Sequence, residues 1–329
     1  MPGIIISEAG GRLKTLYGDY QAPIASCIED TAKAWEAKQI GLKLFAERPS
    51  NHFAEGYTAL TGIGDWEPTG ENGAHPVTDF TEAYDKIVQN VTWKNSFSIS
   101  REMRDDNMIG DMMKRARKLT DSFYATREKH LARMLGVASK GETSFQRGGQ
   151  TFSTTAADGL CVFSKAHKNR VTGETQSNVT GKALDAEALA EAMTAMQNMT
   201  DDKGEIMALC PDTLLIPNIA ALKQAAFAIV GSEKVPGSGN NDYNYLFGNL
   251  DVIVWPYLNQ YIDAAETAPW FLLDRSFNEN DDGAVYQNRV EPEVTSRLGS
   301  NDENIWDGYS RWAAEFINWR FIYGGGLGL

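Results

Sequence analysis

The chain has 329 residues, of which 42% are hydrophobic and 23% are charged, a composition typical of a folded globular protein rather than a disordered one. With 31 basic and 44 acidic residues, its formal net charge is −13, which argues against a surface that grips nucleic-acid phosphates over its whole extent. The three cysteines are far apart and odd in number, which argues against a disulfide framework and favours a reducing compartment.

Neither a targeting segment nor a membrane span is expected. The first residues hold a short apolar cluster with no basic segment before it, unlike a signal peptide. No apolar run approaches the roughly 20 residues that a membrane-spanning helix needs. These observations favour a protein that is made in the cytoplasm and has no membrane partner.

Two segments of different character precede the first long helical pattern. Residues 1–54 are predicted to form an arm that includes a helix within residues 27–45, where Ala and Lys are frequent. Residues 55–99 are rich in Thr, Gly, Asp and aromatic side chains and contain the turn-forming stretch GDWEPTGENGAHP. Alternating apolar residues from Val91 to Ile99 predict a strand at the end. We expect residues 55–99 to form an extended, β-rich excursion without a compact core of its own.

Residues 101–135 predict one long helix. They contain no proline and a single glycine, and their apolar residues recur at steps of three and four. Ser100 can cap the start of this helix, and Gly136 can end it. Such a helix would have about 35 residues and a length of about 50 Å, far beyond the usual globular helix. The segment therefore predicts a structural spine.

The rest of the chain mixes strand and helix patterns. Asp185 can cap a helix, and a second helix is predicted over residues 219–230. The short apolar stretches TLLIP, DVIVWP and WFLLD predict strands, and residues 286–329 begin and end in strand patterns. This order of elements predicts an α+β fold.

The stretch GLCVFSKAHKNRVTG is the one place where a cysteine and a histidine lie close in sequence, at Cys161 and His167. Catalytic Cys–His pairs normally come from distant parts of a chain, and a zinc site needs about four ligands with short paired spacings. A hydrolase that uses Cys161 with His167 is kept as a remote alternative. The favoured interpretation is a short apolar strand around Cys161, followed by a polar loop that contains His167.

Other chemical motifs are incomplete. The chain has no GxxxxGK[ST] phosphate loop. The stretch NENDDG imitates part of a calcium loop, but Arg289 stands where the last glutamate ligand belongs. We therefore predict a protein that is not an enzyme, with no catalytic, cofactor-binding or metal-binding residues and no cofactor. A basic run on the predicted spine, KRARK, is interpreted as a solvated helix face, a contact with acidic residues of a neighbouring copy, or a nucleic-acid contact.

A series of stretches from about Asp106 to the end of the chain resembles the major capsid proteins of tailed bacteriophages. In order, these are KHLARMLGVA, GLCVFSKAHKNRVTG, LDAEALAEAMTAMQNMTDDKGEIMALCPDTLLIPNIA, GNLDVIVWPYLN and APWFLLD. The likeness is strongest to the Mu-like group of major head subunits, and it implies the Hong Kong ninety-seven-like capsid fold. It rests on the ordered series rather than on any single motif.

The resemblance divides the chain into named parts. These are an N-terminal arm (1–54), an extended loop or E-loop (55–99), a peripheral domain with the spine helix (100–183, helix 101–135), an axial domain (184–285), and C-terminal strands that return to the body (286–329). It implies a head protein that self-assembles into pentamers and hexamers, forms an icosahedral or prolate shell, and resides in the virion after synthesis in the host cytoplasm.

The resemblance also implies partners. We expect a portal protein and a separate scaffolding protein as partners. Whether a decoration protein also binds is not decided by the resemblance. The shell is expected to enclose double-stranded DNA without binding a specific sequence. The candidate inter-subunit contacts are Trp66, Glu67, Glu71, Asp79, Lys114, Arg115, Arg117 and Lys118. The nearest alternative is a shell protein of an encapsulin-type cellular nanocompartment with the same fold.

Overall fold

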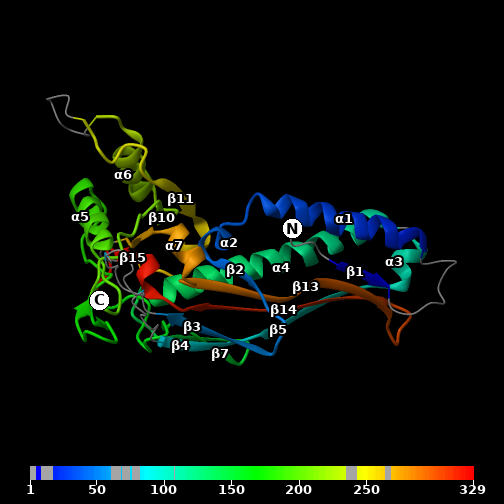
Figure 1. Ribbon diagram of the computed structural model, residues 1–329. Helices are drawn as coiled ribbons and strands as arrows, with labels where there is room; N and C mark the ends of the chain where they lie inside the picture. Colours follow the sequence, from blue (N-terminus) through cyan, green and yellow to red (C-terminus); the bar gives the residue numbers. More distant parts are fainter. Residues whose placement is uncertain are drawn as a thin grey trace. The chain divides into compact units, whose positions relative to one another are not determined.

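The structure, a computed structural model, describes residues 5–8, 18–60, 68, 75, 82–106, 108–234, 243–263 and 268–329. The chain forms two compact units, each assembled from three separate stretches (Figure 1). Unit 1 comprises Met1–Glu55, Val88–Leu131 and Tyr286–Ala314, and unit 2 comprises Gly56–Ile87, Ala132–Val285 and Glu315–Leu329. Both units combine helices with sheets, which confirms the predicted α+β class.

Unit 1 is built on a five-stranded sheet. Its elements are β1 Ile5–Glu8, α1 Gly18–Glu36, α2 Gly41–Leu44, β2 Ala46–Pro49, β5 Val91–Ile99, α3 Arg101–Asp105 and most of α4 Ile109–Ala138, β13 Ala284–Leu298 and β14 Asn304–Phe316. The strands follow one another in the order β1, β13, β14, β5, and β2 also pairs with β13. β1 runs parallel to β13, whereas β5 runs antiparallel to β14. The strand predicted up to Ile99 is therefore confirmed, and it belongs to this sheet.

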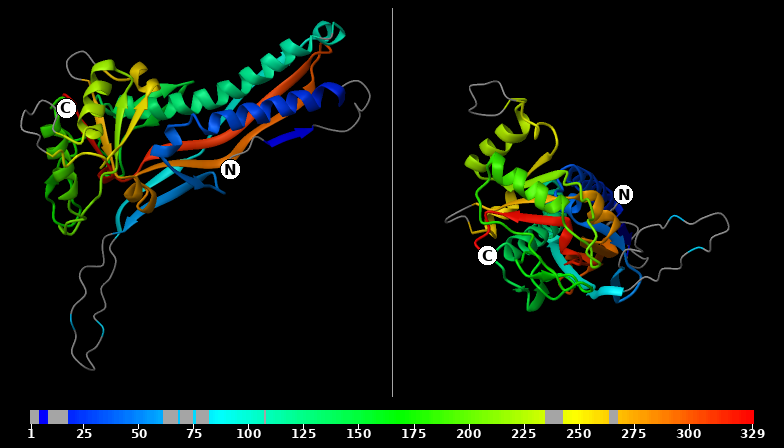
Figure 2. Two further views of the ribbon diagram at one scale, coloured as in Figure 1. Left: turned by 90° about the horizontal axis from the view of Figure 1, so that it is seen from above. Right: turned by 60° about the vertical axis from the view of Figure 1, so that its left-hand side comes forward.

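The core of unit 1 lies between the sheet and two helices. Figure 2 shows α4 running lengthwise beside β13 and β14. The buried cluster contains Ile24 and Ile28 of α1, Met112, Ala116 and Leu119 of α4, and Ile99, Val294 and Trp306 of the sheet. The apolar steps of three and four along α4 place its buried residues on one stripe, which is why this helix packs against a sheet along its length.

The single helix predicted over residues 101–135 is wrong in its bounds, because the structure has two helices there. Ser100 caps α3 as predicted, with its Oγ accepting a hydrogen bond from the Met103 N–H. The helix then ends, with Asp106 as its C-cap residue, and α4 begins at Ile109. Aspartate is a poor helix former because its carboxylate competes for backbone N–H groups, which explains a break at Asp105 and Asp106.

The end of the spine helix also differs from the prediction. α4 continues through Gly136 to Ala138, so that this glycine lies inside the helix and does not end it. A Cβ atom at position 136 would lie 2.6 Å from Cβ of Tyr261 and 3.0 Å from its carbonyl carbon. Only glycine fits there without a shift, because the backbone of Tyr261 approaches the helix closely.

Unit 2 holds a four-stranded sheet and the smaller hairpins. Its elements are the last turns of α4, β6 Ser144–Arg147, β7 Gln150–Ser153, β8 His167–Lys168, β9 Thr175–Gln176, α5 Ala186–Gln197, β10 Thr213–Pro217, α6 Ala220–Gly231, β11 Asp251–Trp255, the 3₁₀ helix Pro256–Gln260, β12 Trp270–Leu273, α7 Arg275–Asn280, the 3₁₀ helix Trp319–Phe321 and β15 Ile322–Gly325. The sheet order is β11, β10, β12, β15. The three predicted strands and both predicted helices are confirmed, and Asp185 caps α5 by accepting from Ala188 N–H at 2.7 Å.

The extended segment contributes one further pair of strands. β3 Ala54–Leu60 pairs with β4 Glu82–Gln89 in a two-stranded sheet. Within unit 2, the Lys86 ammonium donates to Glu315 at 2.8 Å and to the carbonyl oxygens of Thr155 and Phe316 at 2.6 and 3.0 Å. These bonds hold the end of β4 near Lys86 against the rest of unit 2. Among the described residues, none of the helices is long and apolar enough to cross a membrane.

Candidate functional site

The structure contradicts a catalytic pair of Cys161 and His167. The Cys161 sulfur is buried and donates to the carbonyl oxygens of Ala138 at 3.4 Å and Glu142 at 3.6 Å. Burial raises the pKa of this thiol, whereas a nucleophilic cysteine needs a lowered one. Both ring nitrogens of His167 are engaged elsewhere, so neither is left to accept a proton from the thiol. The cysteine-hydrolase alternative is therefore rejected.

The prediction that His167 is a loop residue is also wrong. Its side chain is fully buried, with Nδ1 2.5 Å from the Asp158 carboxylate and Nε2 3.3 Å from the Val162 carbonyl oxygen. The indole of Trp319 stacks on the imidazole, with ring centroids 4.1 Å apart. The predicted strand around Cys161 is likewise absent, and only an isolated bridge joins Cys161 to Thr155. Buried hydrogen bonds, and not the predicted strand, hold the residues around Cys161.

A second buried polar group binds the same connector to the end of the chain. The Arg320 guanidinium donates to Asp202 at 3.1 Å, to the Asn169 side chain at 3.0 Å and to the Thr200 carbonyl oxygen at 3.1 Å. Asn178 donates to the carbonyl oxygens of Val162 and Ile322. Because a buried charge is stable only when it is paired, these bonds fix residues 158–178 against the last strand of unit 2.

The basic run on α4 lies on its solvent-exposed face. Lys114 pairs with Asp111 at 3.0 Å, and Arg115 donates to the Ser98 carbonyl oxygen at 2.7 Å. Arg117 and Lys118 are exposed, and they form no ion pair with any residue that the structure describes. Two cationic side chains on a rigid helix are thus accessible to a partner of opposite charge.

The other four candidate contacts cannot be placed on this surface. Trp66, Glu67, Glu71 and Asp79 lie outside the described residues. The assignment of these four residues therefore stays a prediction.

Comparison with known proteins identifies the family. A family model described as phage capsid protein matches residues 83–324, well over half of the chain. The chain belongs to the phage capsid protein family. This capsid protein is accordingly a structural component of a phage virion, and the family match favours the phage head over the nanocompartment alternative. No curated protein matches its sequence.

The capsid of one phage confirms the fold of this capsid protein. The capsid of Ralstonia phage GP4 superposes with a TM-score of 0.55 at 10% identity, covering 88% of this chain and 89% of that chain. The procapsid of bacteriophage JBD30 gives a TM-score of 0.49 at 14% identity, covering 95% and 75%. At such low identity the likeness to GP4 shows the fold alone, which is the Hong Kong ninety-seven-like capsid fold. Assignment to the Mu-like group stays a prediction.

Proposed function

We propose that this capsid protein is the major head subunit of a tailed phage and self-assembles into pentamers and hexamers that close an icosahedral or prolate shell. The family match over residues 83–324 carries the proposal. Two features of unit 1 support it. Helix α4 packs lengthwise on a sheet, which makes a stiff body, and its exposed basic face leaves charges for contacts between copies.

Each part of the chain has a proposed place in the shell. The E-loop (55–99) reaches over a neighbouring subunit with the residues between β3 and β4, because β5 and the arm (1–54), with α1 and β2, belong to the body of their own subunit. The peripheral domain (100–183) carries the spine, the axial domain (184–285) surrounds the fivefold and sixfold axes, and residues 286–329 return to the body. The β3–β4 pair, anchored at Lys86, supports the E-loop assignment, because a projecting arm needs a fixed base.

The contacts between copies are proposed to be partly electrostatic. Arg117 and Lys118, with their neighbours Lys114 and Arg115, would meet acidic side chains of the next copy. Trp66, Glu67, Glu71 and Asp79 would contribute from the E-loop. Exposed charges at the edge of an interface affect the rate and the salt dependence of association more than the affinity. Weak contacts of this kind suit subunits that must dissociate and rebind when they are misplaced.

We further propose a role without catalysis, in the host cytoplasm during synthesis and in the virion afterwards. A net charge of −13 suits a container whose wall must not bind the DNA packed within it. Portal and scaffolding proteins are the proposed partners in assembly, and a decoration protein is a possible addition to the outer surface.

Electron microscopy of the purified chain, alone and co-expressed with its scaffolding protein, tests the proposal. We expect closed shells with fivefold and sixfold units. Shells isolated from infected cells should contain DNA, whereas a nanocompartment would contain a protein cargo. A chain that stays monomeric at high concentration under both conditions and is absent from virions would contradict the proposal.

A further inference from the structure

Two arginine side chains lie beside the β6–β7 hairpin of unit 2 (Figure 1). Arg133 belongs to the part of α4 in unit 2, and its guanidinium carbon lies 4.6 Å from the centroid of the Phe145 ring on β6. The same carbon lies 6.0 Å from the centroid of the Tyr261 ring. Arg147 is the last residue of β6, and it is near enough for the charge of Arg133 to act on it. Two cations thus share one small region of unit 2.

Aromatic side chains hold Arg133 in place. Phe145 stacks on Phe152 across the hairpin, with ring centroids 5.5 Å apart, and both rings are buried. Tyr261 approaches α4 closely at Gly136, which is one helical turn after Arg133. A cation interacts with the face of a ring through its charge, and the planar guanidinium has five N–H donors. Most donors of Arg133 are therefore left for other groups.

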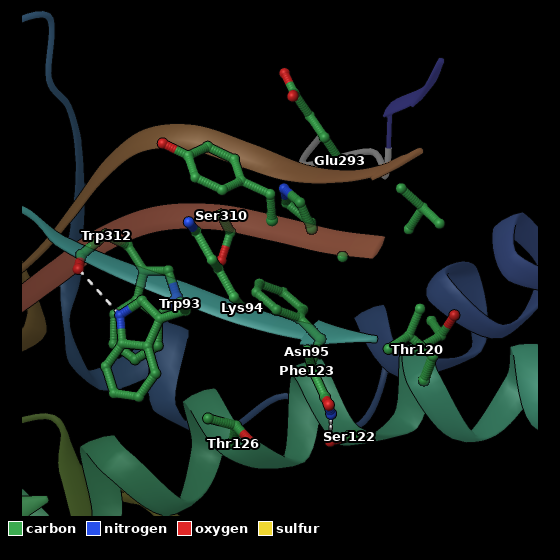
Figure 3. A pocket seen from close by; sticks show the side chains of 15 residues that line it. Trp93, Lys94, Asn95, Thr120, Ser122, Phe123, Thr126, Glu293, Ser310 and Trp312 are labelled. Atoms are coloured by element: carbon green, nitrogen blue, oxygen red, sulfur yellow. Dashed lines mark hydrogen bonds between the residues drawn. The ribbon is translucent and has the colours of Figure 1, made fainter. Parts of the chain in front are cut away.

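Other cations that lie over aromatic rings are compensated in one of two ways. Arg127 and Arg320 are buried, and each donates to a side-chain oxygen of the protein. Lys94, labelled in Figure 3, and Arg170 are exposed, so water solvates their charges. Arg133 is half-buried, and it forms no hydrogen bond or ion pair with any residue that the structure describes. Its charge is therefore only partly solvated and lacks an acceptor in that part of the chain.

Arg147 adds a second positive charge at the same place. Burial lowers the pKa of the Arg147 guanidinium, Tyr261 acts in the opposite direction, and the charge of Arg133 lowers this pKa as well. Two like charges that are partly withdrawn from water repel each other, and an anion in contact with both removes that cost. Arginines in such positions are typical of sites that recognise a carboxylate or a phosphate.

The surroundings favour a carboxylate over the phosphates of a nucleic acid. A duplex presents a row of phosphates, and a protein that grips it uses several cations along that row. Residues 140–153, which contain the hairpin, have two basic residues, Lys140 and Arg147, and one acidic residue, Glu142. A single guanidinium fork matches one planar carboxylate instead. Arginine together with Tyr and Phe is also typical of the centres of protein–protein interfaces.

We propose that Arg133 and Arg147 bind the carboxylate of an aspartate or glutamate from a second copy of this chain. This inference rests on the proposed shell, in which copies with 44 acidic residues each are brought against one another. Arg133 provides the fork of N–H donors, and Arg147 provides the second charge, so the contact is charge-assisted and oriented. It is distinct from the contact proposed for Arg117 and Lys118, which belong to unit 1.

Zero-length cross-linking of assembled shells tests the contact. Arg133→Lys keeps the charge and supplies an amine, which a carbodiimide joins to a touching carboxylate as an amide while the carbodiimide takes up the water and becomes a urea. Shells are assembled from a mixture of unlabelled and isotope-labelled chains of this variant, so that a bond between copies gives peptide pairs of mixed label. We expect mixed pairs that join position 133 to an aspartate or glutamate. Their yield should exceed that at the exposed Lys140 by about tenfold, because contact raises the effective concentration of the carboxylate.

Removing the charge provides the second arm of the test. Arg133→Gln should raise the subunit concentration needed for shell formation by about 10-fold, the effect of losing one hydrogen bond between charged groups. Arg133→Lys should stay within about threefold of the natural chain, because it keeps the charge. Lys140→Gln removes an exposed charge from the same region and is the control, with an expected change of less than about twofold. Urea unfolding checks that each variant folds, and the cross-link decides if Arg133→Gln does not.

The outcomes separate this inference from the proposed function. If shells form but position 133 gives no cross-link, or only pairs of one label, this inference fails and the proposed function stands. If the natural chain forms no shells, both fail. Shells of Arg133→Gln that assemble normally and retain less DNA would identify a phosphate as the anion and would also overturn the inference.

Discussion

The Nδ1 atom of His167 lies 2.5 Å from the Oδ2 atom of Asp158, and both side chains are almost completely withdrawn from solvent. Trp319, far along the chain, stacks on the ring. This contact joins the connector after the spine helix to the C-terminal part of unit 2. His167, which its proximity to Cys161 in the sequence made a remote catalytic candidate, is instead part of a structural joint.

Replacing one member of this pair should destabilise unit 2 strongly. We expect His167→Leu to lower the free energy of unfolding by about 3 kcal/mol, because the Asp158 carboxylate would stay buried without its partner. The double variant with Asp158→Leu should recover part of this loss. Urea unfolding measures both. Glu191→Gln, which removes an exposed ion pair with Lys182, is the control and should have almost no effect. Equal effects of the buried and exposed changes would show that the joint contributes little.

The three cysteines should react at very different rates. Cys210 is exposed, whereas Cys27 and Cys161 are buried. With iodoacetamide at pH 8, we expect the unassembled native chain to be alkylated first at Cys210, and at the other two at least about 100-fold more slowly, because only an accessible thiolate reacts. Mass spectrometry of timed samples resolves the sites, and urea should make the three rates similar. Rapid alkylation of Cys161 in the native chain would contradict its burial.

Two glycines of α4 should respond oppositely to alanine. Gly136→Ala is expected to cost about 1–3 kcal/mol of unfolding free energy, because its Cβ would clash with the Tyr261 backbone. Gly110→Ala meets no atom within 4 Å and should be neutral or stabilise by up to about 1 kcal/mol through helix propensity. Thermal unfolding of the two variants distinguishes the contacts. If both substitutions stabilise the chain, the approach of Tyr261 is looser than described.

The basic face of α4 should matter for assembly and not for folding. We expect Arg117→Glu with Lys118→Glu to leave the unfolding midpoint unchanged, because neither side chain is in an ion pair within the described residues. Shell formation, followed by sedimentation and electron microscopy, should be slowed at least about tenfold at low salt. The control is the double variant Lys43→Glu with Lys140→Glu, which makes the same change in charge at other exposed positions. Normal assembly of the first variant would remove this face from the proposed interface.

The proposed E-loop can be tested by shortening it. Replacing residues 66–79 with a short Gly-Ser linker should leave a folded subunit, because loop length has only a weak effect on stability. The same variant should fail to form closed shells if these residues contact a neighbouring copy. Circular dichroism checks the fold, and electron microscopy checks assembly. Intact shells from the shortened chain would mean that the arm is not required.

Local signals were sufficient for much of the fold. Ser100 and Asp185 are capping residues recognisable from the sequence, and both accept the expected backbone hydrogen bond. The apolar periodicity predicts one continuous helix across Asp105, although the pair of aspartates there is a local signal against it. The role of Gly136 depends on Tyr261, a contact that no local pattern reveals.

Burial of single polar residues was the least predictable feature. His167 stands in a polar stretch, and its surroundings alone are typical of a loop. It is buried because Asp158 pairs with it and Trp319 covers it, and the second partner is remote in sequence.

The interleaving of the two units has a consequence for synthesis. The sheet of unit 1 pairs β5 with β14, which lie about 200 residues apart, and β1 with β13. A ribosome that adds about 5–20 residues per second would leave β5 without its partner for roughly 10–40 seconds. Such non-local pairing makes folding slow and late. A nascent chain therefore presents no finished subunit surface until most of its length has been made, which delays its entry into a growing shell.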